Sequence, residues 1–220
     1  MIPDRLRAGL RALLPTALLR RRLPAGGGVL LTFDDGPDPA VTPAVLDRLR
    51  AYGARAVFFV TGRQADRWPG LVRRLVRDGH RVGNHSYSHP RPGTLSAAGY
   101  LRDVWRCQGA VARAGVGRPR LFRPPYGRLS AVTLLGVRPL GLRPVTWTLD
   151  VNDWQCRGAI AVERAGAALV ERVAPRDIVL LHDNRPSVLA VLDRALPVLA
   201  RRFDLAGGAA ALGDAGTPRL

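Results

Sequence analysis

Two adjacent carboxylates end the first apolar run of the chain. Asp34 and Asp35 follow the run at 29–33 and precede a Gly-Pro turn, a pattern typical of a strand that ends in a loop. Neighbouring residues on a strand point to opposite sides, so the pattern predicts different tasks for the two acids. One could bind a metal ion while the other handles protons. The alternative is that Asp34 caps the turn that follows, as Asp38 would.

Two of the four histidines lie within a single five-residue segment. His85 and His89 are four residues apart, and Asn84 is suited to cap a short helix that would place both imidazoles on one face. Two histidines and one carboxylate with open positions are typical of catalytic sites for zinc or a related divalent ion. Asp35 would complete such a site, and Asp34 could then take a proton from a water activated by the ion. Taken alone, a histidine pair of this spacing is often a surface feature.

A third cluster follows the apolar residues at 120–122. Arg123 could pair with a carboxylate and keep it ionised. Two prolines then fix a turn, after which the backbone N–H of Tyr126 could face the site as an oxyanion donor. Without the other clusters, these residues would be interpreted as an ordinary loop.

Two further clusters follow apolar runs near the C-terminal end. Asp153 could hydrogen-bond a histidine and raise its pKa, and Trp154 beside it could supply an apolar wall. His182 follows the run at 178–181, where a histidine with a carboxylate to tune it can act as a general acid. Each could also be structural, and His80, at a predicted helix-to-strand turn, is interpreted as structural.

The elements that must position these residues alternate along the chain. Strands are predicted at 29–33, 56–61, 81–83, 120–122, 144–148 and 178–181, and helices at 41–52, 66–78, 95–114, 128–137, 160–173 and 186–201. This alternation indicates an α/β protein with a parallel sheet, either open and doubly wound or closed into a small barrel. Both architectures place their sites at the carboxyl ends of the strands, where each cluster falls.

The composition suits one domain but is strongly basic. The 220 residues are 47% hydrophobic and 23% charged, with a formal net charge of +17, and this length can bury a full core. The electrostatic field of a protein with such a positive net charge attracts anionic surfaces. However, every basic residue is arginine, a bias typical of GC-rich coding, and no basic stripe is interleaved with aromatic residues. We therefore expect no nucleic-acid partner.

The two ends are expected to lie outside the domain at 29–206. Residues 1–28 form a basic extension whose apolar stretch is interrupted by Pro15, which makes a poor signal peptide and is too short to span a bilayer. It could lie on an anionic membrane or wall surface or be solvated, which leaves export open. Residues 207–220 are expected to form a flexible tail. Cys107 and Cys156 could form a disulfide, although two separate buried thiols are favoured.

Taken in order, the five clusters resemble the polysaccharide deacetylase family, carbohydrate esterase family 4, whose shared unit is the NodB homology domain. The resemblance covers about 29–205 and implies a distorted (β/α) barrel of about seven parallel strands, NodB-type, with one divalent metal. Zinc would be the usual ion, with cobalt or another divalent ion as alternatives. The matching stretches are TFDDG at 32–36, HSYSH at 85–89, RPPY at 123–126, DVNDW at 150–154 and LLH at 180–182.

The resemblance also implies a reaction and a role for each residue. The reaction would be hydrolysis of acetyl groups, N-acetyl in the first place, on a glycan such as a chitin-like oligosaccharide, peptidoglycan or another cell-surface polysaccharide. The alternatives are an O-acetyl esterase acting on a xylan-like polymer and a non-catalytic glycan-binding protein of the same fold. The resemblance implies that Asp35, His85 and His89 bind the metal. Asp34 would be the base, with Arg123 as its orienting partner, and His182 would be the acid, tuned by Asp153. The Tyr126 N–H would donate to the oxyanion, and the walls of an acetyl pocket would be Leu180, Trp154 and Pro124.

Overall fold

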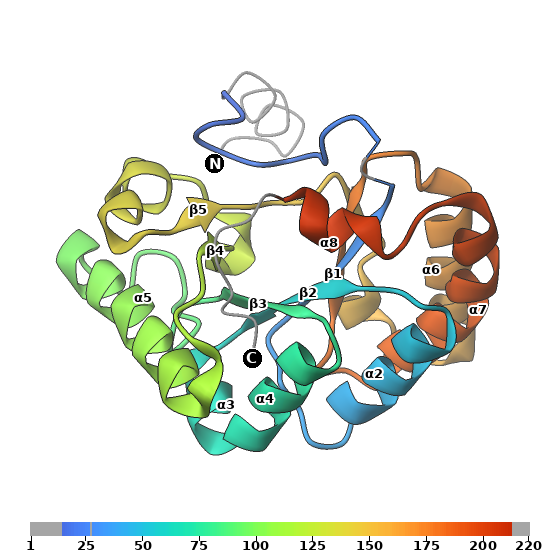
Figure 1. Ribbon diagram of the computed structural model, residues 1–220, viewed down its shortest axis with the longest axis horizontal. Coiled ribbons are helices and arrows are strands. Elements are labelled where there is room, and N and C mark those ends of the chain that lie inside the picture. Colours follow the sequence, from blue (N-terminus) through green and yellow to red (C-terminus); the bar gives the residue numbers. More distant parts are fainter. Residues whose placement is uncertain (1–14, 27, 213–220) are drawn as a thin grey trace.

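A single curved sheet of seven parallel strands forms the centre of the protein (Figure 1). The computed structural model describes residues 15–26 and 28–212. The strand order across the sheet is β5-β4-β3-β2-β1-β7-β6. The strands are β1 (Leu30–Asp34), β2 (Ala56–Val60), β3 (Arg81–Asn84), β4 (Leu121–Phe122), β5 (Arg143–Pro144), β6 (Leu149–Asp150) and β7 (Ile178–His182).

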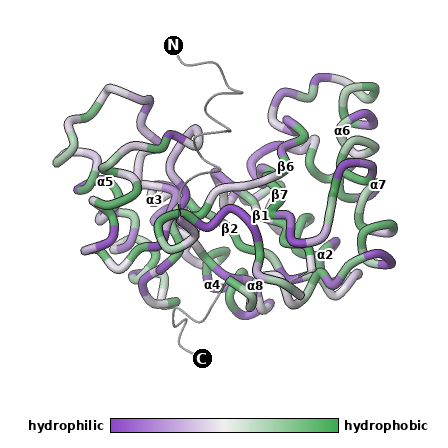
Figure 2. Tube along the Cα trace, turned by 90° about the horizontal axis from the view of Figure 1, so that it is seen from above, coloured by the Kyte–Doolittle hydropathy of each residue, from purple (hydrophilic) through white to green (hydrophobic). Residues whose placement is uncertain are grey.

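Helices form an arc around one face of this sheet. In Figure 1 the arc runs from α5 through α3, α4 and α2 to α7 and α6, while α8 lies across the opposite face. The colour of the tube in Figure 2 changes repeatedly along α5, α6 and α7, as expected of helices that bury one side and expose the other. The helices are α2 (Thr42–Ala51), α3 (Gly62–Arg67), α4 (Pro69–Arg77), α5 (Ala97–Val111), α6 (Ala159–Arg172), α7 (Ser187–Arg202) and α8 (Gly207–Ala211).

The alternation of side chains along β1 divides the core into two parts. Leu31 and Phe33 pack outward against the helices, whereas Leu30 points to the inner side, where it joins a buried cluster with Ile178 and Leu23. All five residues of β1 are buried. Because residues two apart share a face, Thr32 and Asp34 also point to the inner side. Asp34, the first candidate catalytic residue, therefore points into the mouth of the barrel.

The predicted strand at 144–148 is wrong, and the error explains how the barrel closes. Pro144 ends β5 at one edge of the sheet, and Leu149 begins β6 at the other. The residues between them cross the open side: Val145 N–H donates to Phe122 O at 2.7 Å, and Thr148 N–H donates to Ile178 O at 3.0 Å. The expected distorted barrel of seven parallel strands is confirmed, with this crossing segment in place of a continuous wall.

Three other expectations about the elements need correction. The helix predicted at 66–78 is divided into α3 and α4, because Pro69 has no N–H to continue the first helix. The flexible tail predicted at 207–220 begins with α8, whose Ala209 is 4% exposed. The predicted extension is packed against the barrel over 15–26, where Leu19 and Leu23 are fully buried. Residues 1–14 and 213–220 lie outside the described part of the chain.

Two smaller points concern membrane-spanning helices and the cysteines. Within the described residues, no helix is long and apolar enough to cross a bilayer. Cys107 is buried and Cys156 is partly buried, and both are free thiols.

The first prediction tests whether 15–26 belongs to the domain. Leu23→Ala is expected to lower the free energy of unfolding by about 2–5 kcal/mol, since Leu23 is fully buried against Leu30 and Ile178. Urea denaturation followed by circular dichroism measures this. Ile160→Ala is the control, because Ile160 is 73% exposed and should change stability little. A Leu23 variant as stable as the control would show that the segment is not part of the core.

Candidate active site

Parallel strands in register bring the predicted clusters to one end of the barrel. Asp34 lies opposite His182 across β1 and β7, and Asn84 at the end of β3 lies opposite Phe122 at the end of β4. Asp150 at the end of β6 pairs with Leu180. All five motifs therefore lie at the carboxyl end of the sheet, as the sequence predicts.

Arg123 and Asp34 form a buried ion pair. Arg123 Nη1 donates to Asp34 Oδ1 at 2.8 Å and to Thr32 Oγ1 at 2.7 Å, and the arginine side chain is fully buried. Burial raises the pKa of the Asp34 carboxyl, while the charge and hydrogen bond of Arg123 oppose that shift and favour the carboxylate. The pair leaves Asp34 Oδ2 directed at His85, whose Nε2 lies 3.6 Å away.

Asp35, His85 and His89 form a three-ligand cluster. Asp35 Oδ1 lies 3.6 Å from His85 Nε2 and 3.4 Å from His89 Nε2, and one donor atom from each residue falls within 4.8 Å of the other two. His85 Nδ1 is 2.8 Å from the Arg123 carbonyl oxygen, so Nδ1 carries the proton and Nε2 keeps its lone pair for a ligand. Burial also lowers the pKa of His85 to about 3, which keeps the ring neutral. This donor set fits a divalent cation.

The two aspartates do not diverge as strand neighbours would. Strand β1 ends at Asp34, and Asp35 has a left-handed φ of 74°. That conformation turns the Asp35 carboxylate back, so that both acids lie 3.6 Å from His85 Nε2. The alternation predicted from the sequence therefore fails at Asp35. The difference between the acids comes instead from their partners, since Arg123 contacts only Asp34.

The short helix predicted at 85–89 is also absent, and a tight loop brings the histidines together. Ser86 and His89 have positive φ values of 65° and 51°, which no α-helix contains. Asn84 Oδ1 accepts a hydrogen bond from Ser86 N–H at 2.8 Å, and Ser86 Oγ accepts one from His89 N–H at 3.1 Å. Asparagine and serine side chains here compete with helical bonding, and their local bonds fix the ligand loop.

Asp103 on α5 supports this loop, and the sequence reading missed it. Its Oδ2 accepts from Tyr87 N–H at 2.9 Å and from Ser88 N–H at 3.1 Å, and its Oδ1 accepts from Ser88 Oγ at 2.8 Å. The signal was present in the sequence: Asp103 is the one acid in α5, and it lies beside Val104 on the stripe that faces the core. A buried acid on such a stripe needs donors from elsewhere in the fold.

His182 and Asp153 form the second charged pair of the site. His182 Nδ1 lies 2.9 Å from Asp153 Oδ1, and His182 N–H donates to Asp153 Oδ2 at 2.9 Å. Burial disfavours the protonated ring. However, the hydrogen bond and charge of Asp153, aided by Asp34 and Asp35, outweigh burial and raise the pKa of His182 to about 9. The ring therefore carries a proton at neutral pH, with Nδ1 already held by Asp153.

Asp183, the neighbour of His182, braces the turn after the paired acids. Its Oδ1 accepts from Gly36 N–H at 3.1 Å, and its Oδ2 accepts from Thr42 Oγ1 at 2.6 Å. A Cβ at Gly36 would lie 2.2 Å from Asp183 Oδ2, so only glycine fits there. Asp183 therefore positions the turn, and Asp153 is the carboxylate that contacts His182.

The remaining candidates surround the two charged pairs. Tyr126 has a left-handed φ of 58°, and its ring centroid lies 4.6 Å from that of His89. Leu180 and Pro124 are buried, and Trp154 is 43% exposed. An acetyl pocket built from these last three stays a prediction. His80 lies apart, with Nδ1 accepting from Ala56 N–H, in agreement with a structural role.

A parallel barrel whose polar side chains gather at the carboxyl ends of its strands defines the class of α/β barrel enzymes with a site at the barrel mouth. Within that class, a family-wide profile described as polysaccharide deacetylase matches residues 23–145. The chain belongs to the polysaccharide deacetylase family.

Named relatives and solved structures agree with this membership. A chitooligosaccharide deacetylase of Azorhizobium caulinodans is 37% identical over 183 residues, which cover 83% of this chain and 81% of the relative. The peptidoglycan-N-acetylglucosamine deacetylase PgdA of Listeria monocytogenes is 38% identical over 171 residues, 78% of this chain but 35% of that protein. A family 4 carbohydrate esterase from Streptomyces lividans, solved in complex with acetate, superposes with a TM-score of 0.72 at 39% identity and covers 80% of this chain and 90% of that one.

These comparisons confirm the sequence-based assignment to a family of deacetylase enzymes with the NodB-type distorted barrel. They also extend the family match upstream of the predicted domain start, to residue 23. Leu23 is buried in one cluster with Leu30 of β1, so the family match and the packing both include residue 23 in the domain.

The second prediction concerns the support of the ligand loop. Asp103→Asn should weaken Zn²⁺ binding by roughly ten- to a hundredfold, the usual effect of removing a group that orients metal ligands. An amide cannot accept from all three donors that the carboxylate now serves. Competition with a fluorescent zinc chelator gives the affinity.

Asp177→Asn is the matched control for this prediction. Asp177 is a similarly buried acid that accepts from Ala174 N–H and Arg22 at the opposite end of β7. It should cost stability without weakening zinc binding. Equal zinc affinities in the two variants would show that Asp103 does not position the ligands.

Proposed function

We propose that this protein is a metal-dependent hydrolase that removes N-acetyl groups from a glycan. The observation that carries the proposal is the joint presence, at one barrel mouth, of a three-ligand cluster, a carboxylate held by a buried arginine and a histidine held by a buried aspartate. The names of the chitooligosaccharide and peptidoglycan deacetylase relatives support a glycan as the substrate.

Asp35, His85 and His89 would hold the metal, most simply Zn²⁺, with Co²⁺ or another divalent ion as alternatives. When bound, such an ion supplies Lewis-acid activation of a water and of the acetyl carbonyl. The neutral Nε2 atoms of the two histidines and the carboxylate of Asp35 form the ligand set. The other residues of the site then act on protons and on the position of the acetyl group.

Asp34 is the proposed general base. Arg123 occupies Oδ1, so Oδ2 remains to accept a proton from the attacking water on the side that faces His85. Burial raises the pKa of Asp34, and the charge and hydrogen bond of Arg123 oppose that rise. Arg123 therefore orients the base and also disfavours its protonation.

His182 is the proposed general acid. Because Asp153 holds Nδ1, the other ring nitrogen is left to deliver a proton to the departing amine as the C–N bond breaks. Acetate and a free amino sugar are the products. The N–H of Tyr126 would donate to the developing oxyanion, and Leu180, Trp154 and Pro124 would enclose the methyl group.

Two other functions use the same residues. An O-acetyl esterase acting on a xylan-like polymer would need the same base and acid, but the named relatives support N-acetyl glucosamine units. A non-catalytic glycan-binding protein would not need the base, the ligands and the acid together, and all of them are present here. An acetylated glycan, including one of the bacterial cell wall, is the proposed partner.

Acetate release tests the proposal directly. The purified protein with Zn²⁺ should release acetate from an N-acetylglucosamine pentamer, lose this activity when the metal is chelated, and regain it with Zn²⁺ or Co²⁺. An acetylated xylan oligomer is the comparison substrate. No acetate from either substrate in the presence of metal would contradict the enzymatic function, and release from the xylan alone would contradict the N-acetyl preference.

The third prediction concerns pH. Asp153 raises the pKa of His182 to about 9, so Asp153→Asn should lower that pKa. The alkaline limb of kcat/KM, where the acid loses its proton, should then move to lower pH. Asp66→Asn removes one negative charge at an exposed site and should leave this limb in place. An unchanged alkaline limb in the Asp153 variant would contradict the assignment of His182 as the acid.

A further inference from the structure

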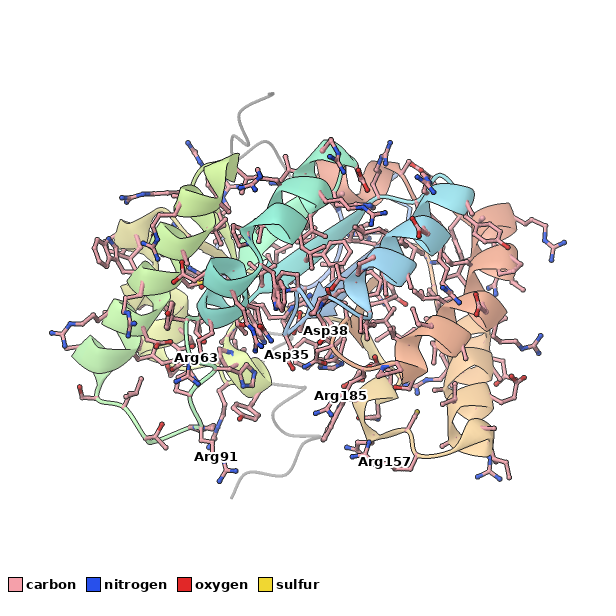
Figure 3. The ribbon with its side chains drawn as sticks, turned by 90° about the horizontal axis from the view of Figure 1, so that it is seen from below. Asp35, Asp38, Arg63, Arg91, Arg157 and Arg185 are labelled. Carbon is pink, nitrogen blue, oxygen red and sulfur yellow. The ribbon has the colours of Figure 1, made fainter. Side chains whose placement is uncertain are left out.

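The side chain of Asn184 lies against Asp35, one of the proposed metal ligands. Asn184 Nδ2 donates to Asp35 Oδ2 at 3.4 Å. Both residues line a hollow of about 390 Å³ that also contains the ligand His89. In Figure 3, Asp35 and Arg185, which follows Asn184, lie at the same end of the molecule. The amide of Asn184 is therefore part of the surroundings of the ligand cluster.

Hydrogen bonds on either side of Asp35 fix Asn184 in this place. Asp183 N–H donates to Asp34 O at 3.3 Å, and Gly36 N–H donates to Asp183 Oδ1 at 3.1 Å. These two bonds attach both chain neighbours of Asp35 to the residue that precedes Asn184. The fold itself therefore sets the amide beside the Asp35 carboxylate.

The two oxygens of the Asp35 carboxylate have different partners. Oδ1 lies 3.6 Å from His85 Nε2 and 3.4 Å from His89 Nε2. Among the described residues, Asn184 supplies the hydrogen bond to Oδ2. An ionised carboxylate accepts hydrogen bonds and donates none, so the amide presents its NH₂ group to Asp35 and not its oxygen. Oδ1 is thus the oxygen directed at the two histidines.

The oxygen of the same amide is left without a partner. Asn184 Oδ1 is buried, and no donor in the described part of the chain reaches it. A buried acceptor without a partner destabilises the fold. Stability alone therefore does not account for an asparagine at this position, whereas the contact of its NH₂ group with Asp35 does.

We propose that Asn184 is a positioning residue that holds Asp35 as a monodentate metal ligand. This inference rests on the proposed function, because it takes Asp35, His85 and His89 as the ligands. A carboxylate can bind a cation through one oxygen or through both. With Oδ2 held by Asn184, Oδ1 alone is directed at the cation, and the coordination positions that a catalytic site needs stay open. Without the amide, Oδ2 is free to fill one of them.

Cobalt in place of zinc tests the inference, because the visible absorption of Co²⁺ weakens as the number of coordinating atoms rises. The full-length protein carrying one Co²⁺ is compared with Asn184→Ala and Asn184→Leu. Leucine keeps the shape of the side chain but has no donor. Both variants should show weaker visible bands than the unmodified protein. Their kcat for acetate release should fall about ten- to a hundredfold, the usual effect of removing a group that orients a metal ligand.

Gln64→Ala is the matched control. Gln64 carries an amide in the wall of the same hollow, and no hydrogen bond within the described residues joins it to Asp35. This variant should keep the bands and the kcat of the unmodified protein. Unchanged bands in both Asn184 variants, or equally weakened bands in Gln64→Ala, would overturn the inference.

The same measurements separate this inference from the proposed function. No Co²⁺ bound by the unmodified protein would contradict the proposed ligand set and the role of Asn184 with it. Bands that weaken in the Asn184 variants, in a protein that releases no acetate, would count against the proposed function and would support the role of Asn184.

Discussion

The buried contact between Arg123 and Asp34 is the interaction on which the site depends. The arginine side chain is fully buried, with its guanidinium carbon 4.2 Å from the centroid of the Phe59 ring. A buried charge of this kind is tolerated only when it is paired and hydrogen-bonded. The pair therefore fixes the end of β1 relative to the loop after β4. The backbone of the same arginine accepts from His85 Nδ1, so one residue sets both the base and a metal ligand.

His85 and His182 show how environment separates the roles of one residue type. Burial against a carbonyl oxygen keeps His85 neutral and lowers its pKa. Contact with the buried Asp153 carboxylate keeps His182 protonated and raises its pKa. Shifts in opposite directions within one site are typical of sites that use one group as a ligand and another as an acid.

Much of this arrangement could be predicted from the sequence because it depends on local patterns. Apolar runs that end in Asp34, Arg123 or His182 indicate strand ends, and the carboxyl ends of parallel strands meet. The predictions failed where the conformation depends on residues that are distant in the sequence. The supports Asp103 and Asp183 bond to residues 15 and 147 positions away. The apolar patterns also do not indicate the left-handed backbone of Asp35 and Ser86, and residues 145–148 leave the strand to cross from β4, where Val145 bonds, to β7, where Thr148 bonds.

Zinc stoichiometry measured by native mass spectrometry tests the division of labour between the adjacent acids. Asp34→Asn should retain one zinc per chain while releasing no acetate, and Asp35→Asn should lose the zinc. The amide of Asp34→Asn can still accept the hydrogen bond of Arg123 but leaves its buried charge unpaired, so circular dichroism first checks that this variant is folded. Loss of zinc from Asp34→Asn together with its retention by Asp35→Asn would contradict the assignment of Asp35 as the ligand and Asp34 as the base.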